Sequence, residues 1–337
     1  MKIAGKSVLI LTNSVDGEHT DSVISNLVKR KESVFRLNVD ELATGKIKLE
    51  FHADQSSPSF QLSDGPVTIA SDDIKSVWYR RPNNFRLAMS DPVQRRFAEE
   101  ESRYVLDGLW LGMDKQFWIS RPDKIEYDRK KLFQLKIAHE AGFRIPKTIV
   151  TNDPQKAKSF LGGCSNGAVF KTIKQGFLDY GDRGFNIPTT LVGPKQIENI
   201  DLVKCPPCLF QELIMKDYEL RVTIVGGQVF AVRIDSQKHV KTSVDWRDPA
   251  LIGSLDYELV ELPEHIHRMC MNITAGLGLE FGAIDLAVTT TGEYVFFEIN
   301  PNGQWYWLER LTGACISDAI ADMLSSGRQT GKEVNQP

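Results

Sequence analysis

The alternation of apolar and polar positions in the first third of the chain predicts a small α/β unit. Residues 6–13 (KSVLILTN) form a short apolar run typical of a buried strand, and a polar-rich helical stretch follows at 19–31. Residues 34–39 predict a second strand. A strand, a helix and a strand in this order favour a parallel sheet, so we expect residues 1–122 to form an N-terminal α/β domain.

Further strands and one long helix complete this unit. Two alternating segments, 46–52 and 59–62, predict a hairpin at the edge of a sheet. Residues 76–79 predict another strand, which ends at Arg80. Pro92 then starts a long helix, because apolar residues recur after it at roughly helical spacing.

One helix and one long loop organise the middle of the chain. Residues 127–142 predict a helix with Gly142 as its stop signal. A strand at 168–173 leads into a glycine-bearing loop at 175–190, and loops of this length inside a compact domain are usually functional or disordered. We expect residues 123–208 to form a second, central domain.

The last third of the chain is rich in strands. Two segments, 218–235 and 281–299, predict hairpins, each with a glycine-containing turn between apolar strands. Two helices follow them, and the polar residues 328–337 form a tail that we expect to be loose. Residues 209–327 therefore form the third predicted domain.

The composition excludes some classes of function. With 337 residues, 42% of them hydrophobic and 25% charged, the chain has the composition of a soluble protein of more than one domain. A net charge of -3 gives no electrostatic reason to expect nucleic acid or an anionic membrane as a partner. No apolar run approaches the roughly 20 residues needed to span a bilayer. We expect a cytoplasmic protein.

The five cysteines include one pair with C-x-x-C spacing, Cys205 and Cys208, so both zinc binding and redox chemistry have to be considered. Zinc normally needs four ligands, and no second closely spaced Cys/His pair stands nearby in the sequence. A thioredoxin-like motif opens a helix after a strand, whereas this pair leads directly into an apolar run. We therefore predict free, structural thiols.

Three oxygen-bearing side chains in the last predicted hairpin suggest a metal site. Glu298 and Asn300 are two residues apart, so their side chains leave the same face of a strand, and Asp285 in the preceding strand can lie across from them. Such a set suits Mg²⁺, which takes its remaining ligands from water and phosphate oxygens. The alternative is three ordinary exposed polar positions. The apolar character of both strands weighs against it, because such strands seldom bury unpaired charges.

Two lysines and a glycine-bearing loop suggest a phosphate site. Lys171 protrudes from a buried strand that runs into this loop, and Lys131 lies near the start of a predicted helix. Ammonium groups offset the charge of a triphosphate, and a glycine loop lets backbone N–H groups approach phosphate oxygens. Each lysine alone is more often a solvated surface charge. The sequence contains no P-loop motif, and no G-x-G-x-x-G follows the first strand.

Several motifs occur in an order that is more informative than any one of them. They are Trp-Tyr-Arg-Arg-Pro at 78–82, Lys-Leu-x-Gln-Leu at 131–135, Asp-Trp-Arg at 245–247 and Phe-Glu-Ile-Asn-Pro-Asn-Gly-Gln-Trp at 297–305. In this order they resemble the motifs of the ATP-grasp superfamily. The resemblance is greatest to the ligases that cyclise ribosomal peptides of the microviridin and plesiocin type (graspetides), and it extends over residues 76–325.

One position departs from the pattern of these ligases. The family usually shows Asn before the lysine of the helix, and Lys130 fills that place here. Either Lys130 or Lys131 can therefore be the nucleotide contact, and the spacing to Leu132 favours Lys131. The Arg-Arg-Pro and Asp-Trp-Arg elements favour the peptide-cyclising branch of the superfamily.

The resemblance implies an ATP-grasp fold of the α/β (α+β) class, with an N-terminal α/β domain before central and C-terminal ATP-grasp domains. It implies ATP and two Mg²⁺ ions as cofactors. In this scheme Lys131 and Lys171 contact the ATP phosphates and the adenine edge. The other nucleotide contacts are the hinge residues Glu212, Leu213 and Ile214, whose backbone groups read adenine, and Glu219, which holds the ribose hydroxyls.

Three further sets of side chains receive roles. The resemblance makes Asp285, Glu298 and Asn300 the metal ligands. It makes Arg221, Lys241 and Arg247 the groups that face the γ-phosphate and the acyl phosphate formed from it. We expect carboxylates of a peptide substrate to meet Arg80, Arg81 and Arg233. Guanidinium forks suit carboxylate geometry, and surface salt bridges within a domain are the alternative for these arginines.

The activity implied by the resemblance is carboxylate activation on a ribosomal precursor peptide. An Asp or Glu side chain of the peptide is phosphorylated by ATP, and a Thr, Ser or Lys side chain of the same peptide then displaces phosphate to form an ω-ester or ω-amide. The partner is a precursor peptide with a leader and a core that carries these residues. A homodimer is one open assembly state.

Two other functions remain open from the sequence. One is an ATP-grasp ligase that adds an amino acid to a small acceptor or to a protein tail. The other is an ATP-binding regulator without catalytic activity, against which the complete set of metal-ligand candidates argues.

Overall fold

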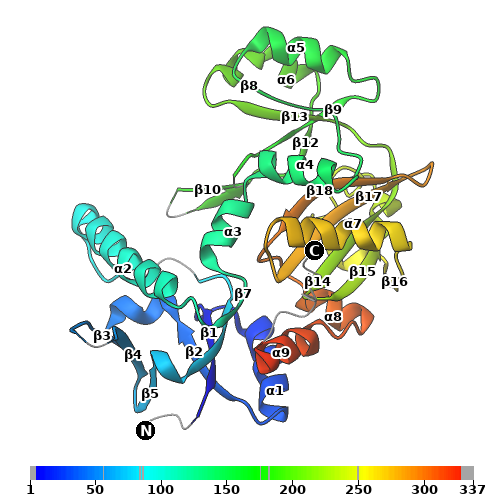
Figure 1. Cartoon of the computed structure of the whole chain (residues 1–337). Coiled ribbons are helices and arrows are strands. Elements are labelled where there is room, and N and C mark those ends of the chain that lie inside the picture. The colour runs from blue at the N-terminus through cyan, green and yellow to red at the C-terminus, as the bar shows by residue number, and fades with distance from the viewer. Residues whose placement is uncertain are drawn as a thin grey trace.

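The computed structural model describes residues 5–327 apart from Ser56, Asn83, Asn84, Arg86, Gln175, Gly181, Asp182 and Pro249. The predicted tail, 328–337, lies outside the described residues. Figure 1 shows an N-terminal unit in blue and cyan at the bottom, a central unit in green at the top and a C-terminal sheet in yellow-green to orange at the right. Helices and strands are mixed throughout, which confirms the predicted α/β class.

The N-terminal unit is built around a parallel sheet with the strand order β2-β1-β6-β7. β1 (Ser7–Thr12) pairs with β2 (Ser33–Asn38) and with β6 (Ile74–Tyr79), and β6 pairs with β7 (Phe117–Ile119). Every residue of β1 is buried, which explains why its sequence is a nearly continuous apolar run. Helix α1 (Gly17–Lys29) joins β1 to β2 and confirms the predicted β-α-β opening.

A small antiparallel sheet flanks this parallel sheet. β3 (Ile47–His52) and β4 (Ser59–Asp64) form the predicted hairpin. β4 also pairs with β5 (Val67–Ala70), a strand that the alternation did not reveal because it has only four residues. Gly65 makes the turn into β5 with a φ of 55°, a conformation that favours glycine.

The long helix α2 (Pro92–Gly112) begins at Pro92 as predicted. Asp91 caps it, because its carboxylate accepts hydrogen bonds from the N–H groups of the first turn. Leu106, Leu109 and Trp110 point inward from α2 and join the core of the N-terminal unit.

The helix predicted over 127–142 is present but begins later than predicted, because two separate helices occupy this part of the chain. They are α3 (Pro122–Asp128) and α4 (Lys131–Glu140), and Lys130 has an extended backbone conformation between them. The buried side chain of Gln134 donates hydrogen bonds to the last carbonyl of α3, at 2.6 Å, and to the carbonyl of Ile299, at 2.7 Å. A contact with the C-terminal sheet therefore accompanies the break between the helices.

The central unit contains an antiparallel sheet in the order β12-β9-β13-β8, with β13 paired to both β9 and β8. Its strands are β8 (Thr148–Thr151), β9 (Ala168–Lys171), β12 (Thr190–Leu191) and β13 (Cys208–Glu212). Two further helices of the central unit are α5 (Pro154–Gly162) and α6 (Pro194–Glu198). Cys205 and Cys208, beside and in β13, are free thiols.

The predicted loop at 175–190 contains a short hairpin. β10 (Phe177–Asp179) pairs antiparallel with β11 (Gly184–Asn186). The N–H of Ile187 donates a 2.6 Å hydrogen bond to the carbonyl of Gly176, which closes the base of the hairpin. In Figure 1, β10 extends from the central unit toward the side where α2 lies.

The C-terminal unit is a five-stranded antiparallel sheet in the order β16-β15-β14-β17-β18. Both hairpins predicted here are confirmed, and β14 and β17 join them edge to edge. The strands are β14 (Lys216–Val225), β15 (Gln228–Ile234), β16 (Tyr257–Val260), β17 (Phe281–Thr289) and β18 (Tyr294–Asn300).

Among the described residues, the last third of the chain contains the α-helices α7 (Glu264–Gly276), α8 (Tyr306–Thr312) and α9 (Ile316–Ser326). α7 packs on the C-terminal sheet. α9 returns to the N-terminal unit, where the Ser76 hydroxyl donates a 2.7 Å hydrogen bond to the carbonyl of Leu324. No helix in the described ranges combines the length and the apolar character that crossing a membrane requires.

Candidate functional site

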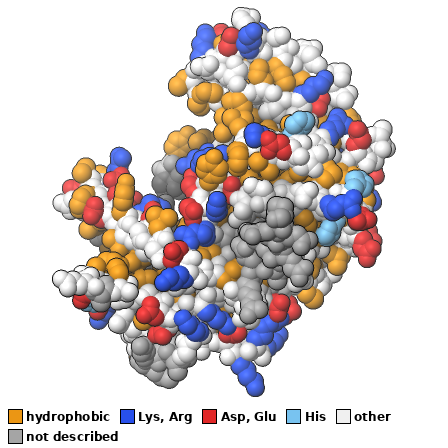
Figure 2. Space-filling view, in the orientation of Figure 1, with side chains coloured by type: hydrophobic (Ala, Val, Ile, Leu, Met, Phe, Trp, Pro, Cys, Tyr) orange, Lys and Arg blue, Asp and Glu red, His pale blue; other side chains and the backbone are white. Residues whose placement is uncertain are grey.

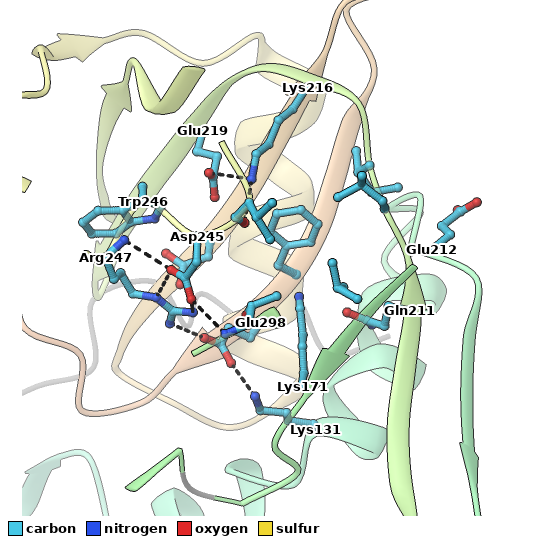
Figure 3. Close-up of a pocket in the computed structure, with 17 residues that line it drawn as sticks. Lys131, Lys171, Gln211, Glu212, Lys216, Glu219, Asp245, Trp246, Arg247 and Glu298 are labelled. Carbon is cyan, nitrogen blue, oxygen red and sulfur yellow. Dashed lines mark hydrogen bonds and ion pairs between the residues drawn. The ribbon is translucent and has the colours of Figure 1, made fainter. Parts of the chain in front are cut away.

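A pocket lies where the central and C-terminal sheets approach each other, and strands from both units line it (Figure 3). β9 and β13 contribute residues from the central unit, and β14, β17 and β18 contribute residues from the C-terminal unit. A second, more open pocket shares Lys131, Lys171, Asp245, Arg247 and Glu298 with the first, so the two are continuous. The hairpin β10–β11 lines this second pocket.

Glu298 is the charged centre of the pocket. Its carboxylate lies 3.2 Å from the ammonium of Lys131, at the start of α4, and 3.2 Å from the guanidinium of Arg247. Burial would raise the pKa of Glu298, but Lys131, Arg247 and Lys171 lower it to about 2. The carboxylate is therefore ionised at every pH at which an ordinary enzyme is assayed.

Lys171 brings a second ammonium group to this place from the end of β9. Its Nζ lies 4.5 Å from the centre of the Phe297 ring. Burial, together with the nearby cations Lys131, Arg247 and Lys216, lowers the pKa of Lys171 to about 8, although Glu298 opposes the shift. The second pocket, which Lys171 also lines, has five Lys and Arg side chains against three Asp and Glu side chains, and this net positive charge favours a polyanionic ligand.

Arg247 forms a bidentate ion pair with Asp245, two residues earlier in the sequence. The guanidinium Nε lies 2.8 Å from one carboxylate oxygen, and Nη2 lies 3.0 Å from the other. Burial would lower the pKa of Arg247, but Asp245 and Glu298 raise it. Trp246, between them in sequence, is buried against Trp307, with ring centres 5.5 Å apart. The Asp-Trp-Arg motif thus anchors one tryptophan in the core and presents one arginine to Glu298.

The three metal-ligand candidates lie on neighbouring strands. Asp285 of β17 is directly opposite Glu298 of β18 in the ladder, and Asn300 is two residues further along β18. The Asp285 carboxylate accepts a 2.8 Å hydrogen bond from Arg221, which is its partner in β14. The Asn300 side-chain oxygen accepts a hydrogen bond from the N–H of Asn302, at 3.0 Å.

The donor set of these three residues fits a hard cation. Two carboxylates and one amide oxygen are ligands that Mg²⁺ accepts while it keeps water or phosphate oxygens in its other positions. In the part of the chain that the structure describes, no cluster of three or more His, Cys, Asp and Glu side chains could hold a metal ion. A metal here would therefore depend on the amide of Asn300 and on oxygens from a bound ligand.

The candidate nucleotide residues lie at the inner end of the first pocket. Lys216 and Glu219 of β14 form a buried ion pair at 2.7 Å, and burial raises the pKa of Glu219. The Glu212 side chain points away from the charged cluster in Figure 3, and it accepts a hydrogen bond from the Lys147 N–H at 3.0 Å. The side chain of Glu212 therefore stabilises the backbone at Lys147 and does not point into the charged cluster.

The hinge has fewer free backbone donors than the sequence suggested. The N–H of Glu212 donates to the carbonyl of Lys147, and that of Leu213 donates to the carbonyl of Gly167, both at 2.9 Å. Within the described residues, the N–H of Ile214 is left as the hinge donor that a bound base could use.

The residues expected to meet a peptide are not brought together. Arg80 is 1% exposed and donates hydrogen bonds to the backbone carbonyls of Asn302 and Gly303, so in this structure it is not accessible to a peptide carboxylate. Its neighbour Arg81 is exposed. Arg233 pairs with Asp235 at 2.8 Å and lies over the Tyr218 ring.

The structure brings most of the other predicted residues into one site. Both pockets are lined by Lys131, Lys171 and Arg247, and Lys241 joins them in the second pocket. Lys216 and Gly303 were not selected from the sequence. Lys216 carries no motif of its own, whereas Gly303 lies in a quoted motif and has no room for a side chain: an added Cβ would lie 2.5 Å from the Ala283 side chain.

Comparisons with known proteins agree with this architecture. Residues 7–126 match a family model described as the MvdD pre-ATP grasp domain. The fold is similar to that of a RiPP-associated ATP-grasp ligase of Chryseobacterium gregarium, solved in complex with ADP and a leader and core peptide. The TM-score is 0.89 and the identity 32%, over 96% of this chain and 97% of that one. It is also similar to the macrocyclase MdnC of Microcystis aeruginosa, bound with the precursor peptide MdnA, with a TM-score of 0.84 and 29% identity over 96% of this chain and all of that one.

A curated relative matches a smaller part of the chain. The human N-acetylaspartylglutamate synthase A is 28% identical over 131 residues, which are 37% of this chain. The match spans about a third (32%) of that relative's length.

Proposed function

The chain belongs to the RiPP-associated ATP-grasp ligases, a family of ATP-dependent peptide ligases, and from this premise we propose that it cyclises a ribosomal precursor peptide. Cyclisation here means intramolecular ω-ester or ω-amide bonds between an Asp or Glu side chain and a Thr, Ser or Lys side chain. The observation that carries the proposal is the group of cations around Glu298, opposite the second carboxylate, Asp285. Both solved relatives were bound with peptides, and the Chryseobacterium ligase also with ADP.

The proposed binding roles follow from charge and position. Lys131, Lys171 and Arg247 offset the charge of the ATP phosphates, and Lys241 extends the positive surface into the outer pocket. The hinge at Ile214 receives the adenine, while the buried pair of Lys216 and Glu219 faces the nucleoside. Asp285, Glu298 and Asn300 are the residues that would hold Mg²⁺, with two ions proposed. Bound Mg²⁺ would supply charge neutralisation at the transferring phosphoryl group.

The proposed reaction uses two displacements. A peptide carboxylate attacks the γ-phosphorus of ATP, the bond to ADP breaks, and an acyl phosphate forms on the peptide. A hydroxyl or amine of the same peptide then attacks the acyl carbon, loses its proton and releases phosphate. Arg221 and Arg247 stabilise the negative charge in both steps, because their guanidinium groups lie beside the carboxylates of Asp285 and Glu298.

The hairpin β10–β11 is proposed as the element that excludes water. Its residue Phe177 lines the outer pocket, so the hairpin lies at the edge of the proposed phosphate site. An acyl phosphate exposed to water hydrolyses, and exclusion of water therefore favours attack by the peptide. Figure 2 shows a hollow between α2 and the part of the central unit that carries β10, through which a peptide could approach this hairpin.

The test is peptide-dependent turnover of ATP. The purified protein is incubated with ATP, Mg²⁺ and precursor peptides that contain a leader and an acidic core, and the release of ADP and phosphate is measured. The proposal expects release that depends on the peptide and is lost when the core Asp and Glu residues are replaced by Asn and Gln. Release that needs a free amino acid and a small acceptor instead would support the amino-acid ligase, the alternative that the synthase relative favours.

A further inference from the structure

The carboxyl edge of the N-terminal parallel sheet faces the segment that follows the metal-ligand strand. β18 ends at Asn300, and residues 300–305, the 300–305 loop, connect it to α8. Ligands often bind at the carboxyl edge of open α/β sheets. Here the side chain of Arg80, which follows β6, contacts this loop of the chain itself, although more than 200 residues separate them in sequence.

Arg80 makes the principal contact between the sheet and the loop. Its backbone N–H donates to the carbonyl of Leu11 at 2.7 Å and extends the ladder of β6 with β1. Its guanidinium Nη1 donates to the carbonyl of Asn302 at 3.0 Å and to that of Gly303 at 3.3 Å. Burial lowers the pKa of Arg80 to about 10, while Asp16 opposes the shift, so the side chain is still charged at neutral pH.

Asp16 and His19 support Arg80 and reach the other end of the loop. The Asp16 carboxylate lies 3.1 Å from Nε of Arg80 and 3.5 Å from Nδ1 of His19. Nε2 of His19 accepts a hydrogen bond from the N–H of Trp305 at 3.3 Å. Burial lowers the pKa of His19 to about 4, and Arg80 also lowers it while Asp16 opposes, so the imidazole is neutral and can accept this bond.

A second arginine holds the loop from the side of the metal ligands. Arg221 donates to the carbonyl of Gln304 at 3.4 Å and to the carboxylate of Asp285 at 2.8 Å. A Cβ at Gly303 would lie 2.7 Å from Nη2 of Arg221, so the loop approaches this arginine as closely as its backbone allows. The loop therefore lies between two guanidinium groups, one from each unit.

From this arrangement we propose that Arg80 and Asp16 are positioning residues, which hold the 300–305 loop so that Asn300 presents its side-chain oxygen to a metal ion. The inference rests on the metal site of the proposed function. Asn302 transmits the effect, because its carbonyl accepts from Arg80 while its N–H donates to the Asn300 oxygen. Groups that orient metal ligands typically change metal affinity by about 10- to 100-fold when they are removed.

A matched control variant distinguishes loss of the loop contact from a general weakening of the contact between the N-terminal unit and the last third of the chain. Arg30, which follows the last residue of α1, also links the N-terminal unit to the last third of the chain, through Asp318 at 2.9 Å, but it lies in the contact between α1 and α9. R80M and R30M each remove one guanidinium between the same parts of the chain. Only R80M removes the contact with the 300–305 loop.

The measurement is the affinity of the full chain for Mn²⁺ in the presence of ADP, read by electron paramagnetic resonance, with the melting temperature recorded in parallel. R80M is expected to weaken Mn²⁺ binding about tenfold or more, and R30M to leave it within twofold of the parent. R80K keeps the charge but loses the fork, so its affinity should fall between those of R80M and the parent. The affinity for ADP without metal should stay unchanged in all three.

Equal Mn²⁺ affinity in R80M and the parent, or equal loss in R80M and R30M, would overturn the inference. If R80M does not fold, R80K and the isosteric D16N provide the comparison, and parental affinity in both would overturn it equally. If the parent itself binds no Mn²⁺ with ADP, the proposed metal site fails. Failure of the metal site is thus distinguishable from failure of the inference, in which the parent binds Mn²⁺ and the Arg80 variants bind it equally well.

Discussion

The carboxylate of Glu298 lies between two cationic side chains. Both are close enough to neutralise its charge when no metal ion is bound. Lys131 and Arg247 lie 3.2 Å from its two oxygens and come from different units of the chain. In a complex with Mg²⁺ and ATP, the ion would share Glu298 with these cations, which could then move toward the phosphates. In the proposed complex, both nucleotide and metal binding would therefore depend on the ionised carboxylate of Glu298.

Replacement of Glu298 by Gln tests this dependence. E298Q keeps the size of the side chain but removes its charge, so peptide-dependent ATP turnover should fall by about a hundredfold or more. Circular dichroism should show an unchanged fold. The control is E293Q, because Glu293 belongs to the same hairpin and pairs with Arg144 at the surface. Normal turnover in E298Q, or equal losses in both variants, would contradict the assignment.

The stability of the protein should depend on pH through His19. The pKa of its imidazole is about 4 in the folded chain and 6.5 when unperturbed. Between these values the unfolded chain binds a proton that the folded chain does not, so stability should decrease as the pH falls from 6.5 toward 4, by at most about 1.4 kcal/mol per pH unit. Chemical denaturation of the parent and of H19Q across this range measures the effect. H19Q should show the shallower dependence, and identical slopes would refute it.

At the scale of elements, the hairpin β10–β11 and the hinge after β13 are the parts of the central unit whose role in the proposed reaction can be tested separately. The hairpin base is closed by the hydrogen bond from Ile187 to Gly176, and a Cβ on Gly176 would lie 2.7 Å from the carbonyl oxygen of Ile187. The backbone would have to shift at this point to accept any side chain. The base of the hairpin therefore requires a glycine at position 176.

G176A should separate ATP consumption from bond formation. A distorted hairpin base admits water to the acyl phosphate. The ratio of phosphate released to ω-ester or ω-amide crosslinks formed should therefore rise several-fold. G162A is the control, because a Cβ at the end of α5 meets no other atom within 4 Å. Phosphate release and mass spectrometry of the same samples give the ratio. An unchanged ratio in G176A would show that the hairpin does not guard the intermediate.

The hinge should select the base of the nucleotide. If the N–H of Ile214 is the donor that reads it, adenine can accept this bond at N1, whereas N1 of guanine carries a hydrogen and cannot. The value of kcat/KM should therefore be about 5- to 150-fold higher for ATP than for GTP, since an unmatched buried donor costs about 1–3 kcal/mol. Equal use of both nucleotides would place the base elsewhere.

The sequence predicted those parts of the site that depend on short-range spacing. Glu298 and Asn300 alternate along one strand, and their hairpin with Asp285 has a glycine-containing turn, so local rules are enough to place them together. The burial of Arg80 could not be predicted in this way. Its partners are backbone carbonyls more than 200 residues away, which carry no signal in the residue types. The break between α3 and α4 escaped prediction for a similar reason, because the Gln134 side chain is bonded to the C-terminal sheet.

At the scale of the whole molecule, the first and last parts of the chain are joined. α9 packs on α1 and on the N-terminal sheet, and Arg80 reaches the loop that follows β18. The N-terminal unit is therefore attached to the sheet that carries the metal-ligand candidates. The central unit approaches the same sheet from its other side and supplies Lys131 and Lys171 (Figure 1). Each unit contributes to the geometry of one site.

The mass of the peptide product tests the central claim most directly. A precursor peptide with a leader and a core of Asp or Glu together with Thr, Ser or Lys is incubated with the protein, ATP and Mg²⁺, and the product is analysed by mass spectrometry. Intramolecular cyclisation predicts the loss of one water for each bond formed, with one ADP released per bond when the hairpin is intact. A product that instead gains the mass of an amino-acid residue, or an unchanged peptide despite ATP consumption, would contradict the account.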